Sequence, residues 1–221
     1  MRYTIIVEGI TDVAFVKYVC FKKKITENFN DFKLQGVTSS NESIEIYRYN
    51  DFYIINLKGQ NKLENVKPIF EPINRKVLKV GVLQDADDDF EKSQNILLKF
   101  KEELEIDNSK IELFLTPNNR DKGDLETLLL SSLEKEKIPQ LQCFQEYKNC
   151  LEKNIDITTK AMNKGELYAY TMFSQNGKEK YTPQNSFMYK NKKYRDTGLW
   201  DLSRDEFSEI IEFIMGIFEQ K

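Results

Sequence analysis

Short apolar runs alternate with longer amphipathic segments over the first 133 residues of the chain. Residues 3–7 form a β-branched run that is typical of a strand. Directly after this run, Thr11 or Asp12 can cap a largely buried helix that extends to about Lys24. The chain is therefore expected to open with a strand that leads straight into a helix.

The same alternation continues through the middle of the chain. We predict a pair of strands around a turn at residues 44–49 and 53–57, further strands at 77–83 and 111–115, and helices at 62–74 and 124–133. Another helix, placed between the last two strands, should bury one face that consists of Ile96, Leu97, Phe100 and Leu104. Because strands and helices alternate, most strands should pair in parallel through right-handed crossovers. The expected fold class is α/β, with a Rossmannoid open parallel sheet flanked by helices.

The last part of the chain has a different pattern. Residues 134–221 are expected to be mainly helical and to pack as an extension on the core formed by residues 1–133, so that the two form one compact unit. In the final helix, Ser203 and Glu206 predict a capping box. The apolar stripe of this helix consists of Phe207, Ile210, Ile211, Ile214 and Phe218. This stripe predicts that the helix docks on the sheet.

Acidic residues follow two of the predicted strands. Glu8 and Asp85 each come first after a strand, and in an open parallel sheet ligands bind beyond the carboxyl ends of the strands. Asp87 lies two residues beyond Asp85, so both side chains can point the same way in extended geometry. Asp12 lies one turn beyond Glu8 at the start of the helix. We therefore expect these four carboxylates at one edge of the sheet.

A cluster of this kind needs a counter-charge. Two like charges ~4 Å apart cost roughly 4 kcal/mol at an effective dielectric constant of 20, so the carboxylates must bind a cation or hold protons. Oxygen ligands alone favour Mg²⁺, with Mn²⁺ or Ca²⁺ as alternatives. For Asp12, a role as helix cap explains the residue equally well. The sequence predicts a divalent-cation site with Glu8, Asp85 and Asp87 at its centre.

The composition narrows the chemistry open to such a site. The 221 residues include no histidine, which excludes imidazole bases, Ser/His/Asp and Cys/His nucleophile systems, and nearly all zinc sites. The net charge of −3 gives no global attraction to nucleic acid, so that partner would need a local basic surface. The odd number of cysteines, the lack of a leader segment and the lack of a ~20-residue apolar run predict a cytoplasmic protein that does not enter a membrane.

These motifs together resemble a Toprim domain, the metal-binding fold of topoisomerases, primases and several nucleases. The resemblance covers about residues 1–133 and rests on Glu8 after the first strand and on Asp85 and Asp87 after a later one. Asp12 matches the glutamate-x-x-x-aspartate form of the overcoming-lysogenisation-defect nucleases. A still closer similarity is to an uncharacterised bacterial Toprim-like family, a domain of unknown function. The motifs that carry this second similarity are Pro117-Asn118, Gly123-Asp124-Leu125-Glu126 and Trp200-Asp201-Leu202.

The resemblance implies a role for each acidic residue. Asp85 and Asp87 would hold Mg²⁺, and Glu8 would bind metal or act as a general acid or base. Asp12 and Glu126 would complete a second metal site, although Glu126 can equally be an ordinary residue on a helix face. Asp88 and Asp89 enlarge the acidic run beyond the family pattern, which leaves open which oxygens bind metal.

A basic segment near the carboxyl terminus is the candidate for nucleic-acid contact. Its cations, interleaved with aromatic residues, are Lys178, Lys180, Lys190, Lys192, Lys193 and Arg195. This mixture suits phosphate contact together with base stacking. A surface loop with solvated lysines and packed aromatic side chains explains the same composition.

Three functions are consistent with these features. The first is a Mg²⁺-dependent phosphoryl-transfer enzyme, most simply a Toprim-type nuclease that acts on DNA or RNA. The second is a non-catalytic module that binds metal together with a nucleotide, a phosphate group or a partner protein. The third is an accessory factor with a vestigial site. The sequence does not decide among them, and it leaves open whether the chain forms a homodimer.

Overall fold

A six-stranded sheet forms the centre of the molecule in the computed structural model, which describes residues 1–37, 44–174, 187 and 199–218. The strands lie in the order β2-β3-β4-β1-β5-β6. Their bounds are β1 Tyr3–Val7, β2 Lys33–Val37, β3 Glu45–Tyr49, β4 Phe52–Asn56, β5 Lys79–Asp85 and β6 Ile111–Thr116. The α/β class predicted from the sequence is confirmed: the sheet is mixed, mostly parallel and flanked by helices.

The sheet has a parallel half and an antiparallel half. β4, β1, β5 and β6 are parallel neighbours, and Ile5 of β1 lies opposite both Ile54 of β4 and Gly81 of β5. β3 pairs antiparallel with β4, as expected for two strands around a turn, and β2 extends the sheet beyond β3. The sequence analysis did not predict β2, because its five residues, Lys33–Val37, lack a continuous apolar or alternating pattern.

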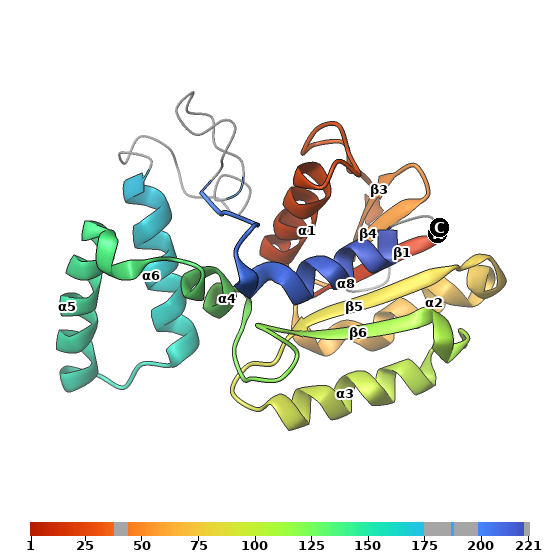
Figure 1. The fold of residues 1–221 in the computed structure, drawn as a ribbon. Coiled ribbons are helices and arrows are strands. Elements are labelled where there is room, and N and C mark those ends of the chain that lie inside the picture. The colour runs from red at the N-terminus through yellow and green to blue at the C-terminus, as the bar shows by residue number, and fades with distance from the viewer. Residues whose placement is uncertain (38–43, 175–186, 188–198, 219–221) are drawn as a thin grey trace.

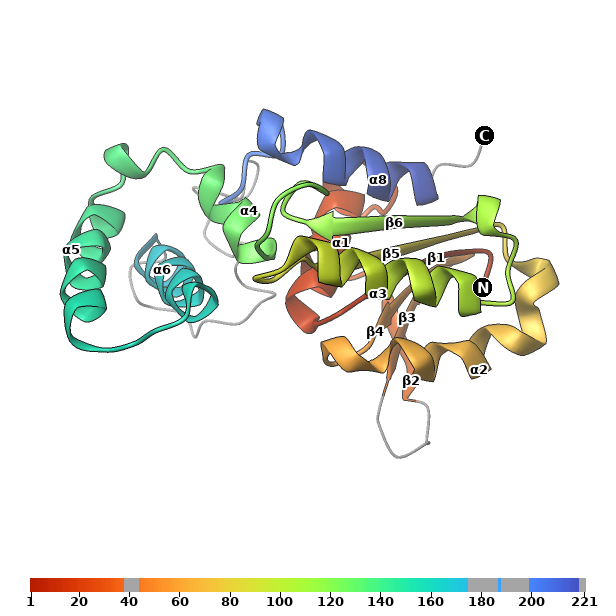
Figure 2. The ribbon, with the colours of Figure 1, turned by 90° about the horizontal axis from the view of Figure 1, so that it is seen from below.

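Helices cover both faces of the sheet. The helices of the structure are α1 Ile10–Lys22, α2 Lys67–Phe70, α3 Phe90–Glu103, α4 Leu125–Ser131, α5 Pro139–Asn154, α6 Thr159–Ser174 and α8 Ser208–Phe218. α1 and α8 lie against one face, and α2 and α3 lie against the other (Figure 2). Each face has its own apolar core. Within the described residues, no helix has the length and apolar character needed to cross a membrane.

The final helix returns to the sheet, as its apolar stripe predicted. Phe207, Ile210 and Ile214 are almost fully buried, and α8 contacts β1, β5 and β6. The helix comes very close to Gly81, where a β-carbon would lie only 2.8 Å from Phe213 Cζ and 2.9 Å from Ile217 Cγ1. The small residue in the middle of β5 therefore allows α8 to pack directly on the strand that leads to Asp85.

Helix starts differ in detail from the prediction. Gly9 caps α1, and Asp12 lies in the first turn, where its Oδ2 accepts a hydrogen bond of 2.8 Å from the Gly9 amide. The predicted capping box of Ser203 and Glu206 is not formed. Both the amide and the hydroxyl group of Ser203 donate instead to Asp201 Oδ1, at 3.0 and 2.6 Å, and α8 begins later, after a short 3₁₀ turn. Ser203 therefore bonds to the nearby Asp201 carboxylate and does not cap the final helix.

Two other predictions need correction. The single helix expected at residues 62–74 is instead a short α-helix, α2, between two 3₁₀ segments, because Pro68 and Pro72 interrupt regular α-helical bonding. On α3, Ile96 is 46% exposed and does not share the buried face of Leu97 and Phe100. The buried face is therefore narrower than predicted.

The segment between α4 and α8 lies beside the sheet. α5 and α6 form a pair of helices next to α4, past the end of the sheet where β6 terminates (Figure 1). α6 contacts both α5 and α4. This places the amino-terminal end of α6 close to the carboxyl edge of the strands.

Candidate functional site

Glu8 and Asp85 lie at the same edge of the sheet. β1 and β5 are parallel neighbours, with Val7 opposite Leu83, so both strands end there. Glu8 is the first residue after β1, whereas Asp85 is the last residue of β5, opposite Thr116 of β6. Asp85 is thus held by the sheet itself and not by a loop.

Hydrogen bonds fix the orientation of the Asp85 carboxylate. Its Oδ1 atom accepts a bond of 2.8 Å from the Thr116 hydroxyl group and one of 3.1 Å from the Leu125 amide. Leu125 is the first residue of α4, so Asp85 lies at the positive end of that helix. Its second oxygen, Oδ2, faces Lys160 Nζ at 3.3 Å. One oxygen therefore has a structural role and the other remains available to a cation.

Asp87 has an unusual backbone conformation. Its φ angle is +51°, a region that L-residues seldom adopt, and its amide and carbonyl groups exchange two 2.7 Å hydrogen bonds with Gly123. Oδ1 of Asp87 accepts a hydrogen bond of 2.6 Å from Lys160. Asp88 and Asp89, which follow, are exposed, and Asp89 caps α3. Within the acidic run, Asp85 and Asp87 therefore belong to the candidate site, whereas Asp89 belongs to the start of α3.

Asp12 and Glu126 are buried on two helices at the same edge. Asp12 is 8% exposed and Glu126 9% exposed. Neighbouring Asp124 is the N-cap of α4: its side chain accepts a hydrogen bond of 2.8 Å from the Thr127 amide. Burial of Asp12 and Glu126 raises the pKa of both carboxyl groups, and the nearby charge of Asp85 adds to the shift in each. Both residues therefore belong electrostatically to the cluster around Asp85.

The cluster carries more negative charge than its surroundings compensate. Burial, followed by the charge of Asp85, raises the pKa of Glu8 to about 7. Burial also raises the pKa of Asp85, although Lys160 opposes that shift. Oε2 of Glu8 is buried and has no hydrogen-bond partner within the described part of the chain. A buried carboxylate oxygen without a donor is costly, and an additional cation would satisfy it.

Lys160, at the start of α6, is the cation that the structure places in the cluster. Its Nζ contacts both Asp85 and Asp87. Burial acts to lower the pKa of Lys160, but the hydrogen bond to Asp87 and the charges of Asp85 and Glu8 outweigh it, so that the pKa is raised. The ammonium group is therefore held in its charged form between the two aspartates.

The donor set suits a hard divalent cation, although the side chains are not arranged around one. Among the residues that the structure describes, no group of three or more acidic or cysteine side chains has a metal-holding arrangement. Carboxylate oxygens, including the unpartnered Oε2 of Glu8, are the donors that Mg²⁺ and Mn²⁺ prefer. Glu8, Asp85 and Asp87 thus fit such an ion chemically, and their side chains would have to rotate toward it.

Comparison with known proteins identifies the family. Residues 2–219 match the family model described as "Protein of unknown function (DUF3226)". The chain belongs to the DUF3226 family. No curated protein and no solved structure shows a significant match. The expected relationship to an uncharacterised domain family is confirmed, and the match extends through the helical part of the chain as well as the sheet.

The sequence analysis of this DUF3226 protein missed Lys160. The residue lies in a polar helical segment, and no local motif distinguishes it from neighbouring lysines. It reaches the acidic cluster only because α6 packs on α4, where Asn163 Nδ2 donates a hydrogen bond of 3.0 Å to Thr127 Oγ1. The predicted nucleic-acid-binding residues, by contrast, lie outside the described residues: Lys178, Lys180, Lys190, Lys192, Lys193 and Arg195.

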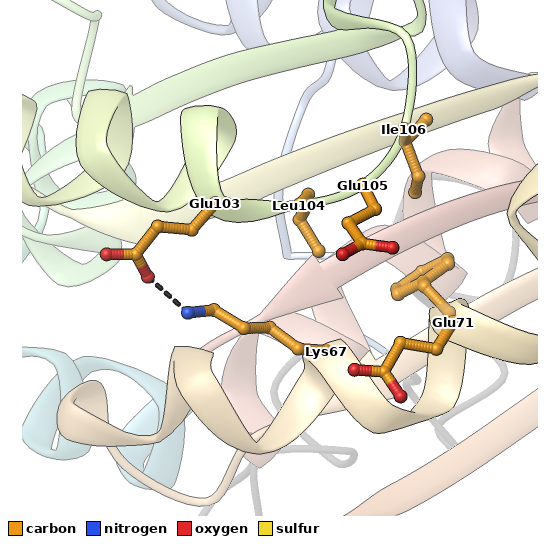
Figure 3. Close-up of a pocket in the computed structure, with 7 residues that line it drawn as sticks. Lys67, Glu71, Glu103, Leu104, Glu105 and Ile106 are labelled. Carbon is orange, nitrogen blue, oxygen red and sulfur yellow. Dashed lines mark hydrogen bonds and ion pairs between the residues drawn. The ribbon is translucent and has the colours of Figure 1, made fainter.

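The DUF3226 protein also has a cavity away from the acidic cluster. This cavity of about 140 Å³ lies between α2 and the carboxyl-terminal end of α3, the opposite end of that helix from the Asp85–Asp89 loop (Figure 3). Lys67 and Glu103, which line it, form an ion pair, and Phe70, Leu104 and Ile106 provide apolar lining. The carboxylate cluster is the stronger functional candidate, because the cavity holds no comparable set of buried charged groups.

Proposed function

We propose that this DUF3226 protein is a Mg²⁺-dependent phosphoryl-transfer enzyme, a Toprim-type nuclease that cleaves DNA or RNA, with Mn²⁺ as an alternative ion. One observation carries the proposal: buried carboxylates with raised pKa values converge at the carboxyl edge of a parallel sheet around the unpartnered Oε2 of Glu8. Perturbed carboxylates at this position of an α/β sheet are a feature of functional sites.

Each residue has a role that its contacts support. Asp85 would offer Oδ2 to the ion while Thr116 and α4 hold Oδ1, and Asp87 would offer its side chain from the strained loop. When bound, Mg²⁺ neutralises charge on the phosphate group and lowers the pKa of bound water. Glu8, whose pKa is about 7, can accept or donate a proton near neutral pH. Such a mechanism requires no histidine.

Asp12 and Glu126 extend the site. They lie on α1 and α4, and burial together with the charge of Asp85 raises the pKa of both. In the proposed enzyme they would hold a second ion for in-line displacement at phosphorus. Both side chains are buried, so a second ion would remove unfavourable negative charge from the interior.

The proposal is tested by incubating the protein with single-stranded and double-stranded DNA and RNA in Mg²⁺ or Mn²⁺. Cleavage is expected, and Asp85→Asn should reduce its rate by roughly a hundredfold or more. Asp89→Asn is the matched control: it removes one charge from the same loop but keeps a side chain that can cap α3, so activity should persist. Absence of cleavage on every substrate, or full activity in Asp85→Asn, would contradict the proposal.

One observation favours a second candidate function. The Lys160 ammonium group already bridges Asp85 and Asp87, so the cluster has an internal counter-ion without metal. A non-catalytic module could use this charged surface to bind metal with a nucleotide, a phosphate group or a partner protein. Thermal unfolding distinguishes the two: stabilisation by metal that nucleotides increase, but oligonucleotides do not, would favour the module.

A further inference from the structure

Lys160 reaches into the acidic cluster from outside the sheet. Its Nζ lies 2.6 Å from Asp87 Oδ1 and 3.3 Å from Asp85 Oδ2. Asp85 Oδ2 is the oxygen that the bonds to Thr116 and Leu125 leave free, and the bonds between Asp87 and Gly123 involve only the backbone. The ammonium group therefore occupies the position where a shared cation would bind both aspartates.

The helix that carries Lys160 is firmly attached. Asn163 bonds to Thr127 on α4, and Glu166, which is 4% exposed, forms an ion pair of 2.6 Å with Lys135. The lysine side chain itself is still 34% exposed. The backbone of α6 is thus fixed beside the cluster, while the long side chain has solvent into which it can move.

We propose that Lys160 is an internal counter-ion, that a divalent cation binds at Asp85 and Asp87 only by displacing its ammonium group, and that this exchange sets the metal affinity of the site. The inference rests on the proposed metal-dependent function and specifies how the site is controlled. An ion that bound both Asp87 Oδ1 and Asp85 Oδ2 would have to lie close to the present position of Nζ, which contacts the same two oxygens. Two cations so close repel strongly at a partly buried site.

Displacement has a measurable consequence. Each metal ion that binds must break two charge-assisted hydrogen bonds of Lys160, so the intrinsic affinity of the carboxylates is partly hidden in the native protein. Removing the ammonium group should therefore increase the measured metal affinity of the site. A gain of roughly tenfold to a hundredfold corresponds to ordinary coupling between two competing events.

The test is calorimetric titration of the full chain with Mn²⁺ and with Mg²⁺. Lys160→Met removes the charge but keeps much of the side-chain length, and Lys160→Gln serves if that variant does not fold. Lys160→Arg retains the charge and should bind metal about as weakly as the native protein. Lys164→Met is the control for charge alone: Lys164 is exposed one turn along the same helix, and its charge acts on Glu126, but it forms no ion pair with Asp85 or Asp87. Asp85→Asn should abolish metal binding at this site, so the heat of binding that is lost in this variant is the heat that arises from the site.

The outcomes separate the two proposals. Tighter binding in Lys160→Met, with native-like binding in Lys160→Arg and a clearly smaller gain in Lys164→Met, supports displacement. Binding that depends on Asp85 but is equally strong in Lys160→Met overturns the counter-ion role and leaves the metal site standing. An equal gain in Lys164→Met also overturns it, because the effect would then be one of general charge. Absence of Asp85-dependent binding in every variant overturns both proposals.

Discussion

The backbones of Asp87 and Gly123 are joined by two hydrogen bonds of 2.7 Å each, which connect the acidic loop after β5 to the turn before α4. Both residues have positive φ angles, +51° and +142°. A β-carbon at Gly123 would lie 3.0 Å from Thr127 Oγ1 and 3.1 Å from Pro117 Cδ. The position of the Asp87 side chain therefore depends on a residue without a side chain at position 123.

Replacing Gly123 by alanine should loosen this connection. The new β-carbon combines an unfavourable φ angle with close contacts, so we expect the free energy of unfolding to fall by about 1–3 kcal/mol. Because Asp87 would shift with its partner, metal affinity should fall as well. Urea denaturation measures the first effect, and calorimetric titration with Mn²⁺ measures the second.

Gly59→Ala provides the control. Gly59 has a similar φ angle, +139°, but a β-carbon there would meet nothing within 4 Å. This variant should show only the backbone cost and should keep native metal affinity. If both variants lose equal stability and Gly123→Ala binds metal normally, the link between the two loops is unimportant to the site.

The acidic cluster should make the metal-free protein less stable at higher pH. The folded-state pKa of Glu8 is about 7, above its ordinary value of 4.5, so between these values the folded state binds more protons than the unfolded state. The free energy of unfolding therefore falls as pH rises from about 4.5 to 7, by at most about 3 kcal/mol from this group. Glu8→Gln should flatten the decline, as measured by urea denaturation across that range.

Saturating Mg²⁺ supplies the control for this pH effect. A bound cation favours the charged carboxylate, so the decline of stability with pH should shrink or reverse in the native protein. Glu8→Gln should respond less to the ion. If the metal-free Glu8→Gln variant and the native protein showed the same dependence of stability on pH, Glu8 would not have a raised pKa.

Two glycines at the interface of α8 with the sheet should respond in opposite directions to alanine. In Gly81→Ala the new methyl group would overlap Phe213 and Ile217, so stability should fall by roughly 1–3 kcal/mol. Gly216 lies within α8, and a β-carbon there meets its nearest atom, Glu112 Oε2, at an ordinary 3.7 Å. Gly216→Ala should therefore raise helix stability by about 0.5–1 kcal/mol. Thermal unfolding of both variants checks the predicted signs.

Local patterns were sufficient to predict most of the sheet and the edge at which Glu8 and Asp85 meet. Continuous apolar runs predict the strands β1 and β5. Because these two strands pair in parallel, their carboxyl ends lie at the same edge of the sheet. β2 was missed because its position at the sheet edge does not require an apolar sequence. Elements that are buried because their own residues are apolar can therefore be predicted from the sequence.

The contacts that complete the site could not be read from local sequence. Lys160 reaches Asp85 only through the packing of α6 on α4, and Asp87 is oriented by its distant partner Gly123. Both relationships depend on tertiary packing between segments far apart in the chain. For Asp12 the sequence left two interpretations open, helix cap and metal ligand. In the structure Gly9 is the N-cap and Asp12 supports it from the first turn of α1, while the role of Asp12 as a metal ligand stays a prediction.

The variant Asp12→Asn separates these two roles. Asparagine can still accept the hydrogen bond that Asp12 Oδ2 receives from the Gly9 amide, so the start of α1 should be preserved. Burial and the charges of Asp85 and Glu8 raise the pKa of Asp12 well above its ordinary value, so removing its charge should leave the metal-free protein at least as stable at pH 7. If Asp12 is a ligand, Mn²⁺ affinity should fall about tenfold or more. Asp12→Ala, which loses the cap as well, should in addition destabilise the protein by about 1 kcal/mol. Unchanged affinity in Asp12→Asn would restrict Asp12 to holding the helix that follows Glu8.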